Sequence, residues 1–284
     1  MQIKFWGVRG SIASPGPETA EVGGNTASIE VTCGPTRILL DAGTGIRRLG
    51  DALLARGPLD ATLLLSHLHW DHIQGLPFFV PAYLASSRLR VCGMGGATPL
   101  REALARQMQA PNFPVRLDEL AAEMSYDEVT VGQPFEVGAA RVRAAKANHP
   151  GGALAYRIEH EGKSLVYATD TEHFACVDPS LRELAYRADV LIYDAQYTPD
   201  EYAGRLGRTK VGWGHSTFVA GAELAREAEV GQLVLFHHDP ARTDAGVAEL
   251  ERMARQLFPA TIAAREGLEL APGCVVGPAS ARAA

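Results

Sequence analysis

Four side chains that can bind metal ions, His67, His69, Asp71 and His72, stand within the six-residue stretch HLHWDH. The stretch directly follows residues 61–65, an apolar run typical of a buried strand. Alternate side chains of an extended segment share a face, so His67 and His69 can reach one ion. Asp71 and His72 lie beyond the point where the chain must turn, and they can reach a second ion. The alternative is a polar loop with surface histidines, and three histidines and an aspartate at this spacing argue against it.

Three further candidate ligands, His149, Asp170 and His237, each follow a short apolar run that ends in a loop. Any one of them alone would be an ordinary loop residue. A site for two divalent ions about 3.5–4 Å apart needs several donors and one bridging carboxylate. The sequence supplies such a set. The predicted ligands are His67, His69 and His149 for one ion, Asp71, His72 and His237 for the other, and Asp170 between them.

This pattern resembles the metallo-β-lactamase superfamily, whose HxHxDH signature matches residues 67–72 and whose later ligands match His149, Asp170 and His237. The resemblance covers essentially the whole chain. It implies the α/β class, a four-layer αβ/βα sandwich and a dinuclear hydrolytic site at the edge of that sandwich. Zinc is the first choice for both ions because imidazoles dominate the ligand set, and manganese or iron are the alternatives.

Two more motifs resemble one branch of this superfamily, the branch of RNase Z and the phosphoribosyl cyclic phosphodiesterases. Residues 214–217, GHST, match its His-Ser-Thr element, and residues 192–197 match its second element with Asp194 at the carboxylate position. The resemblance implies that His215 protonates the leaving oxygen while Asp194 orients it. Such a donor suits phosphodiester hydrolysis, because displacement at phosphorus expels an alkoxide. Asp71 is counted with this pair as a catalytic residue as well as a ligand.

A structural role for the GHST stretch is the alternative. Ser216 or Thr217 could cap a helix that starts at Phe218, with His215 as a neighbour of the cap. Both roles can hold at once, because a cap would fix the backbone that aims His215.

The substrate prediction depends on what the chain lacks. RNase Z enzymes carry a long arm that grips transfer RNA, generally between the ligands that match His149 and Asp170, and here only residues 150–169 lie between them. The formal net charge of -6 also argues against a nucleic-acid partner. We therefore expect no transfer-RNA arm and a small or cyclic phosphodiester as substrate, with a homodimer as one option for assembly.

Positive charge gathers in one place despite this balance. Arg205, Arg208 and Lys210 precede His215, and no acidic residue lies between Ala203 and Gly214. The cluster could face a phosphate-bearing substrate, or it could serve surface solubility, and the sequence does not decide between the two.

The elements expected around these residues form two halves. The first third is rich in short β-prone runs, with a helix after residues 41–45, another through residues 78–84 and a third over residues 100–108. A second β-rich block starts near Phe135 and later alternates with helices, the last of them around residues 247–257. Two β-then-α halves facing one another would give the four layers, and we expect residues 1–284 to form a single domain.

The compartment is predicted from absences. No apolar run is long enough to span a bilayer, and the chain start lacks a signal-peptide pattern. The four cysteines, Cys33, Cys92, Cys176 and Cys274, form no CxxC pair and are interpreted as reduced thiols. These features predict a cytoplasmic protein without a membrane partner.

Together the motifs predict a dinuclear metallohydrolase in which metal-activated hydroxide attacks phosphorus and His215 acts as general acid. Two alternatives stay open. One is hydrolysis of a carboxyl ester, lactone or thioester by the same activated water. The other is an accessory protein that keeps the fold without turnover, and the complete ligand set argues against it.

Overall fold

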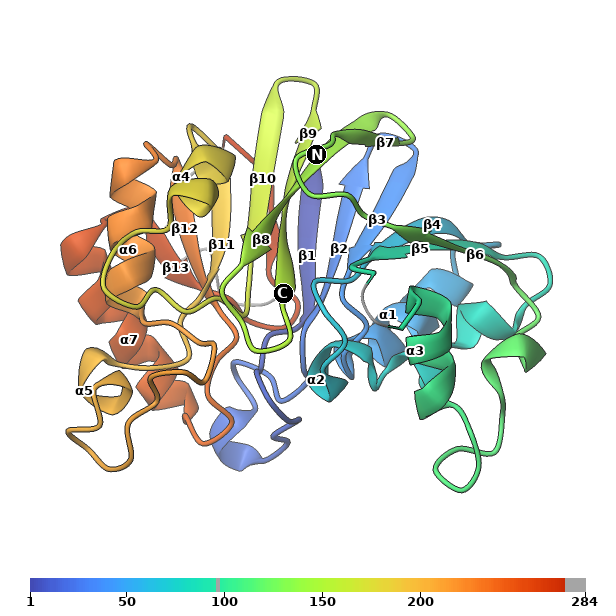
Figure 1. Ribbon diagram of the computed structural model, residues 1–284, viewed down its shortest axis with the longest axis horizontal. Coiled ribbons are helices and arrows are strands. Elements are labelled where there is room, and N and C mark those ends of the chain that lie inside the picture. Colours follow the sequence, from blue (N-terminus) through green and yellow to red (C-terminus); the bar gives the residue numbers. More distant parts are fainter. Residues whose placement is uncertain (96–97, 274–284) are drawn as a thin grey trace.

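The computed structural model describes residues 1–95 and 98–273, which build two seven-stranded β-sheets (Figure 1). In spatial order, the first sheet contains β14 (Glu269–Leu270), β1 (Gln2–Gly7), β2 (Ser28–Cys33), β3 (Thr36–Leu40), β4 (Asp60–Leu64), β5 (Arg88–Gly93) and β6 (Glu123–Glu128). The second contains β13 (Thr261–Ala263), β12 (Gln232–Phe236), β11 (Val190–Asp194), β10 (Lys163–Ala168), β9 (Ala153–His160), β8 (Ala140–Ala147) and β7 (Phe135–Val137).

Each sheet is parallel in one part and antiparallel in the other. Strands β3 to β6 run parallel, with Leu40 of β3 paired to Leu64 of β4. Strands β10 to β13 also run parallel, with Tyr193 of β11 paired to Leu235 of β12. Neighbouring parallel strands end at the same edge of their sheet, so the loops that follow them lie together. This arrangement decides where the polar loop residues meet.

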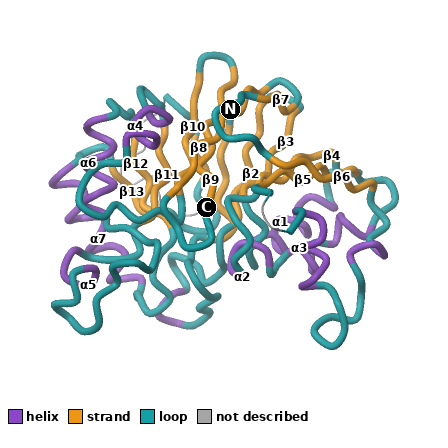
Figure 2. Tube along the Cα trace, viewed as in Figure 1, coloured by secondary structure: helices purple, strands orange, loops and turns teal. Residues whose placement is uncertain are grey.

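Helices cover the outer face of both sheets (Figures 1 and 2). The helices of the structure are α1 (Gly45–Leu54), α2 (Trp70–Ile73), α3 (Leu100–Gln107), α4 (Pro179–Ala185), α5 (Pro199–Tyr202), α6 (Phe218–Glu227) and α7 (Asp244–Leu257), with short 3-10 turns at Pro17–Thr19, Leu76–Phe78, Val80–Tyr83 and Leu117–Glu119. Helices α1 and α3 pack on the first sheet, and α4, α6 and α7 pack on the second. Short α2 lies at one edge of the sheets (Figure 1).

Three hydrophobic cores separate the resulting four layers. The central core joins side chains of both sheets, such as Ile29 and Leu165. A second core lies between the second sheet and its helices, and the third lies between the first sheet and its helices. The spacing of buried residues in α1, with Ile46, Leu49 and Leu53 on one side, is that of a helix facing a sheet. The α/β class and the four-layer sandwich expected from the sequence are therefore confirmed.

Two local predictions need comment. The stretch at residues 78–84 forms 3-10 turns and no α-helix, so that prediction is wrong. Pro81 lacks the N–H that an α-helix would use and disfavours helical backbone at the residue before it.

Cys33, Cys92 and Cys176 are free, and Cys274 lies outside the described residues.

In the described part of the chain no helix is both long and apolar enough to cross a membrane. That residues 1–284 form one domain stays a prediction.

The central core predicts a measurable stability difference. Leu165 is fully buried between the sheets, whereas Leu206 is 72% exposed. Leu165→Ala should lower the free energy of unfolding by about 2–5 kcal/mol, because it removes buried methyl groups and leaves a cavity. Leu206→Ala, the matched control, should change it by less than about 0.5 kcal/mol. Urea unfolding of both variants measures this, and equal effects would contradict the layer assignment.

Candidate metal centre and proton-donor pair

All seven predicted ligands come together at one edge of the sandwich, five of them after the end of a strand and two in a short helix. His67 and His69 follow β4, and the four-residue helix α2 carries Asp71 and His72. His149 follows β8, Asp170 follows β10 and His237 follows β12. Ligand atoms of His67, His69 and His149 lie within 4.8 Å of one another, and so do those of Asp71, His72, Asp170 and His237.

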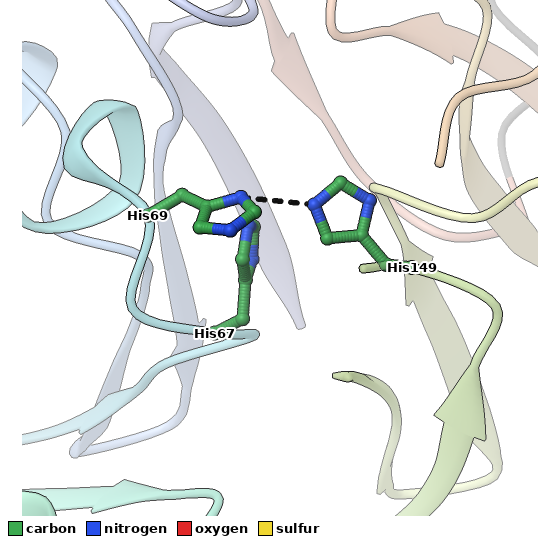
Figure 3. A group of neighbouring side chains, drawn as sticks. All are labelled: His67, His69 and His149. Carbon is green, nitrogen blue, oxygen red and sulfur yellow. Dashed lines mark hydrogen bonds between the residues drawn. The ribbon is translucent and has the colours of Figure 1, made fainter. Parts of the chain in front are cut away.

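The first of these groups consists of three histidines. His69 and His149 point a ring nitrogen toward one another, with a distance of 2.9 Å between His69 Nδ1 and His149 Nε2 (Figure 3). His67 lies beside them, and its buried Nε2 has no hydrogen-bond partner in the described structure. A buried nitrogen left without a partner is costly unless something binds it. Its position among other imidazole nitrogens fits a metal ion.

The second group combines histidines with carboxylates. Asp71 Oδ2 lies 3.2 Å from His72 Nε2 and 3.2 Å from His237 Nε2. Two donors bound tetrahedrally to zinc at about 2.0–2.1 Å are about 3.3 Å apart. The observed spacing therefore suits a shared ion. The backbone N–H of Ser11 donates to the same Asp71 oxygen at 2.7 Å and fixes its orientation.

Asp170 lies between the two groups and presents one oxygen to each. Its Oδ2 is 3.7 Å from His67 Nε2 and 3.8 Å from His149 Nε2. Its Oδ1 is 3.2 Å from His72 Nε2 and 3.2 Å from His237 Nε2. A carboxylate placed in this way can bridge two ions, as the ligand pattern predicts.

The Nδ1 atom of four histidines is held by a second partner. That of His67 lies 3.1 Å from Ser66 Oγ, and that of His149 donates to the Gly214 carbonyl at 2.8 Å. Such contacts fix the tautomer and leave Nε2 free for a metal. His72 Nδ1 lies 2.8 Å from Asp41 Oδ2, and His237 Nδ1 lies 3.0 Å from Gln196 Oε1.

The carboxylates of the second group favour positive charge on the imidazole beside them. Burial lowers the pKa of His72, but the carboxylates of Asp170, Asp71 and Asp41 raise it well above its usual range. Burial raises the pKa of Asp170, but His237 and neighbouring imidazoles hold it well below its usual range. Anionic carboxylates clustered around imidazoles are the environment that a divalent cation requires, so the donor set fits the implied metals.

Asp41 supports this cluster through a network of hydrogen bonds. Its buried carboxylate accepts hydrogen bonds from the Ser66 N–H at 2.7 Å, the Ser66 hydroxyl at 2.8 Å and the Tyr167 hydroxyl at 2.6 Å. His72 Nδ1 provides the fourth contact. Asp41 therefore ties two strands of one sheet to Tyr167 of the other and orients a histidine that is a candidate ligand.

The second predicted pair also forms. His215 Nδ1 lies 2.9 Å from Asp194 Oδ2, and both side chains are buried. Asp194 Oδ1 accepts from the backbone N–H of Ser216 and of Gln196. Burial lowers the pKa of His215, but the charge and hydrogen bond of Asp194 raise it to about 9. Thr217 caps α6 through a bond from the Ala220 N–H, so the capping alternative and the histidine–carboxylate pair coexist.

The pair lies beside the ligand cluster. Ligand atoms of Asp170, Asp194, His215 and His237 are all within 4.8 Å of one another. An open pocket of about 460 Å³ brings together residues of both motifs. Its lining comprises Ser11, Leu68, His69, Trp70, Asp71, Asp170 and His215.

The structure adds residues that the sequence did not single out for a role. Gln196 holds His237, and Glu172 accepts from the N–H groups of Gly212 and Gly214 just before His215. Gln196 stands two residues after Asp194, so the motif contained it without indicating its contact. Gly10 allows the chain to pass against His237, because a Cβ there would collide with that imidazole.

Comparison with known proteins agrees with this geometry. Residues 36–238 match the model of the β-lactamase superfamily domain. Ribonuclease Z of Mycobacterium sp. (strain KMS) is 31% identical over 286 residues, which cover 94% of this chain and 96% of that protein. Zinc-bound PqqB from Methylobacterium extorquens has a TM-score of 0.71 at 19% identity, covering 95% and 100% of the two chains. The short form of human tRNase Z has a TM-score of 0.64 at 18% identity, covering 96% and 100%.

The family match and the relative named Ribonuclease Z identify the chain as a metal-dependent hydrolase. The chain belongs to the β-lactamase superfamily, in its RNase Z-like branch, as the motifs predicted.

The predicted partner is wrong. A relative named Ribonuclease Z aligns over nearly its whole length, which conflicts with the expectation of a small phosphodiester and no transfer-RNA arm. That expectation depended on the short connection at residues 150–169 and on the net charge of -6. The connection forms a hairpin of β9 and β10, and a short connection there does not exclude RNA contacts elsewhere on the surface. Net charge is an average over the chain and does not give the charge of a local surface.

The Asp41 network predicts the effect of an isosteric change. Asp41→Asn places an NH₂ group among four donors, so it should lower the free energy of unfolding of metal-free protein by about 3–5 kcal/mol. Metal affinity should fall about 10–100-fold because His72 loses its partner. Urea unfolding with chelator and metal titration measure the two effects.

Tyr167→Phe is the matched control, since it removes one of the four bonds and should cost about 1.5–3 kcal/mol. A larger loss for Tyr167→Phe than for Asp41→Asn would contradict the assignment of Asp41 as the centre of the network.

Proposed function

We propose that this protein hydrolyses phosphodiester bonds of RNA with two divalent metal ions and His215 as general acid. The observation that carries the proposal is the Asp194–His215 pair, at 2.9 Å, which lies beside the ligand cluster and whose His215 lines the same pocket. A positioned proton donor of this kind suits phosphodiester hydrolysis, because displacement at phosphorus expels an alkoxide that needs a proton as it leaves. RNA as the substrate class is supported by the relative named Ribonuclease Z.

The two ions would be held by the two side-chain groups described above. His67, His69 and His149 would bind one, Asp71, His72 and His237 the other, and Asp170 both. Zinc is the preferred choice, because five of these seven donors are imidazoles, and manganese or iron are the alternatives. When bound, the ions lower the pKa of a water molecule and polarise a phosphoryl oxygen.

His215 completes the reaction by moving a proton. Its Nδ1 is engaged by Asp194, so Nε2 is the nitrogen that can donate to the departing ribose oxygen. Asp194 itself is fixed by two backbone N–H groups, which keeps the imidazole in one orientation. Thr217 fixes the start of α6 and with it the backbone on which His215 stands. The chain thus provides a positioned donor with little freedom to reorient.

The ligand set predicts metal stoichiometry. We expect two ions per chain by elemental analysis of protein purified without chelator. Asp170→Ala should lose both, because one carboxylate faces both groups of ligands. Asp51→Ala, an exposed aspartate on α1, is the matched control and should retain both. A wild-type content of one ion after zinc or manganese addition would refute the dinuclear proposal.

The proton-donor pair predicts a dependence on leaving group. His215→Ala should lower kcat/KM for RNA by about 10²–10⁴-fold, because a ribose alkoxide needs a proton as it leaves. The kcat/KM for methyl 4-nitrophenyl phosphate should fall far less, since nitrophenolate leaves without a proton. Asp194→Asn should follow the same pattern more weakly. Metal content should stay at the wild-type value in both variants.

Three outcomes would contradict these roles. Loss of metal in His215→Ala would make the residue a ligand. Equal losses on both substrates with metals retained would leave His215 to position phosphate. A wild-type preference for a lactone or 4-nitrophenyl acetate over either phosphodiester would refute the proposed reaction.

A further inference from the structure

The rim of the pocket carries an exposed indole that has no role in the proposed reaction. Trp70 is the first residue of α2 and lines the same pocket as Asp170 and His215. Its side chain is 79% exposed, and no ring or cation of the described residues packs against it. An open aromatic face beside the site of phosphate hydrolysis is able to stack a nucleobase.

Positive charge lies in the loop that leads to His215. Lys210 Nζ is 4.1 Å from the ring centre of Trp213 and 5.6 Å from that of Tyr197. The Tyr197 ring in turn packs edge-on against His215, with 6.0 Å between ring centres. Lys210 is therefore linked through one ring to the proposed proton donor.

The cations of the loop before His215 differ in whether a carboxylate already pairs with them. Arg205 forms an ion pair with Asp200 at 2.9 Å. Arg208 packs over Trp213 instead, with 5.9 Å from its guanidinium carbon to the ring centre. Within residues 1–95 and 98–273 no carboxylate is ion-paired with Arg208 or Lys210, so both charges can meet a phosphate.

The loop is anchored where it presents these groups. Glu172 accepts from the Gly212 N–H at 2.7 Å and the Gly214 N–H at 2.9 Å, on either side of Trp213. The same carboxylate accepts from the Tyr202 hydroxyl, and the Lys210 N–H donates to the Tyr202 carbonyl. A surface fixed in this way loses little conformational entropy when a ligand binds.

We propose that the pocket rim is a binding subsite for single-stranded RNA, in which Trp70 stacks a nucleobase and Arg208 and Lys210 hold backbone phosphate. The proposal rests on the proposed RNA phosphodiesterase function and names how the substrate is held. Charge and an aromatic face together match a single strand, because every base offers a π-face and every nucleotide a phosphate. A duplex would keep its bases stacked on each other and would leave Trp70 without a partner.

Fluorescence anisotropy tests the subsite directly. The probes are a fluorescein-labelled single-stranded RNA 12-mer and an abasic strand of equal length and charge, each with metal-loaded His215→Ala protein to slow cleavage. Trp70→Ala in that background should weaken RNA binding roughly 10-fold and leave the abasic strand unaffected. Trp70→Phe should restore most of the affinity, and Leu206→Ala, a change of another exposed apolar residue, should have no effect.

The cations give an independent readout. Arg208→Gln and Lys210→Gln should weaken both strands alike and should each lower the slope of log affinity against log salt by about 0.7. Equal loss of RNA and abasic binding in Trp70→Ala, or no loss at all, would overturn the stacking role. Absence of RNA binding by the parent protein would overturn the whole subsite.

The function itself is judged on a different substrate. Methyl 4-nitrophenyl phosphate carries no base, so its hydrolysis by the wild-type chain tests the proposed reaction without the subsite. Hydrolysis of this diester with no effect of Trp70→Ala on RNA would refute the subsite alone. Failure of the wild type to hydrolyse either diester would refute the proposed function, whatever the binding data show.

Discussion

One buried carboxylate, that of Asp170, constrains the rest of the site. A lone anion in the interior would be costly, and the surrounding imidazoles offset that cost only where their nitrogens converge on it. His67 and His149 approach one oxygen, and His72 and His237 approach the other. These four histidines come from segments that follow strands of both sheets, so the charge balance of the site requires that the two halves of the sandwich meet at this edge.

The strand ends meet this requirement through a backbone conformation that is rare for residues other than glycine. Asp41, Asp170 and His237 each follow a strand of a parallel segment and adopt a positive φ, between 51° and 59°. Non-glycine residues rarely take this conformation, which costs about 1–3 kcal/mol and persists where surrounding contacts determine it. Here those contacts are the hydrogen bonds and charges of the site itself. The same interactions that would bind metal therefore stabilise the turns that aim the ligands.

The sequence allowed the layers and the clustering of the candidate ligands to be predicted, because both depend on the local spacing of residues. The HLHWDH stretch places four candidate ligands within six residues. Apolar runs mark the strands whose ends carry His149, Asp170 and His237. Contacts such as Glu172 with Gly214, or Gln196 with His237, join residues tens of positions apart and leave no local pattern. The substrate prediction failed for a related reason, since net charge contains no information on where the unpaired cations lie.

Gly214 shows how closely the proposed functions of this surface depend on one another. Its carbonyl accepts from His149 Nδ1, its N–H donates to Glu172, and the next residue is His215. Its φ is +84°, and a Cβ at this position would collide with the His149 ring. One glycine thus joins a candidate ligand, the Glu172 contact that anchors the loop before His215, and the proposed proton donor. A shift of this loop on RNA binding would therefore move His149 and His215 together, so substrate contacts at the rim and the geometry of the metal centre cannot vary independently.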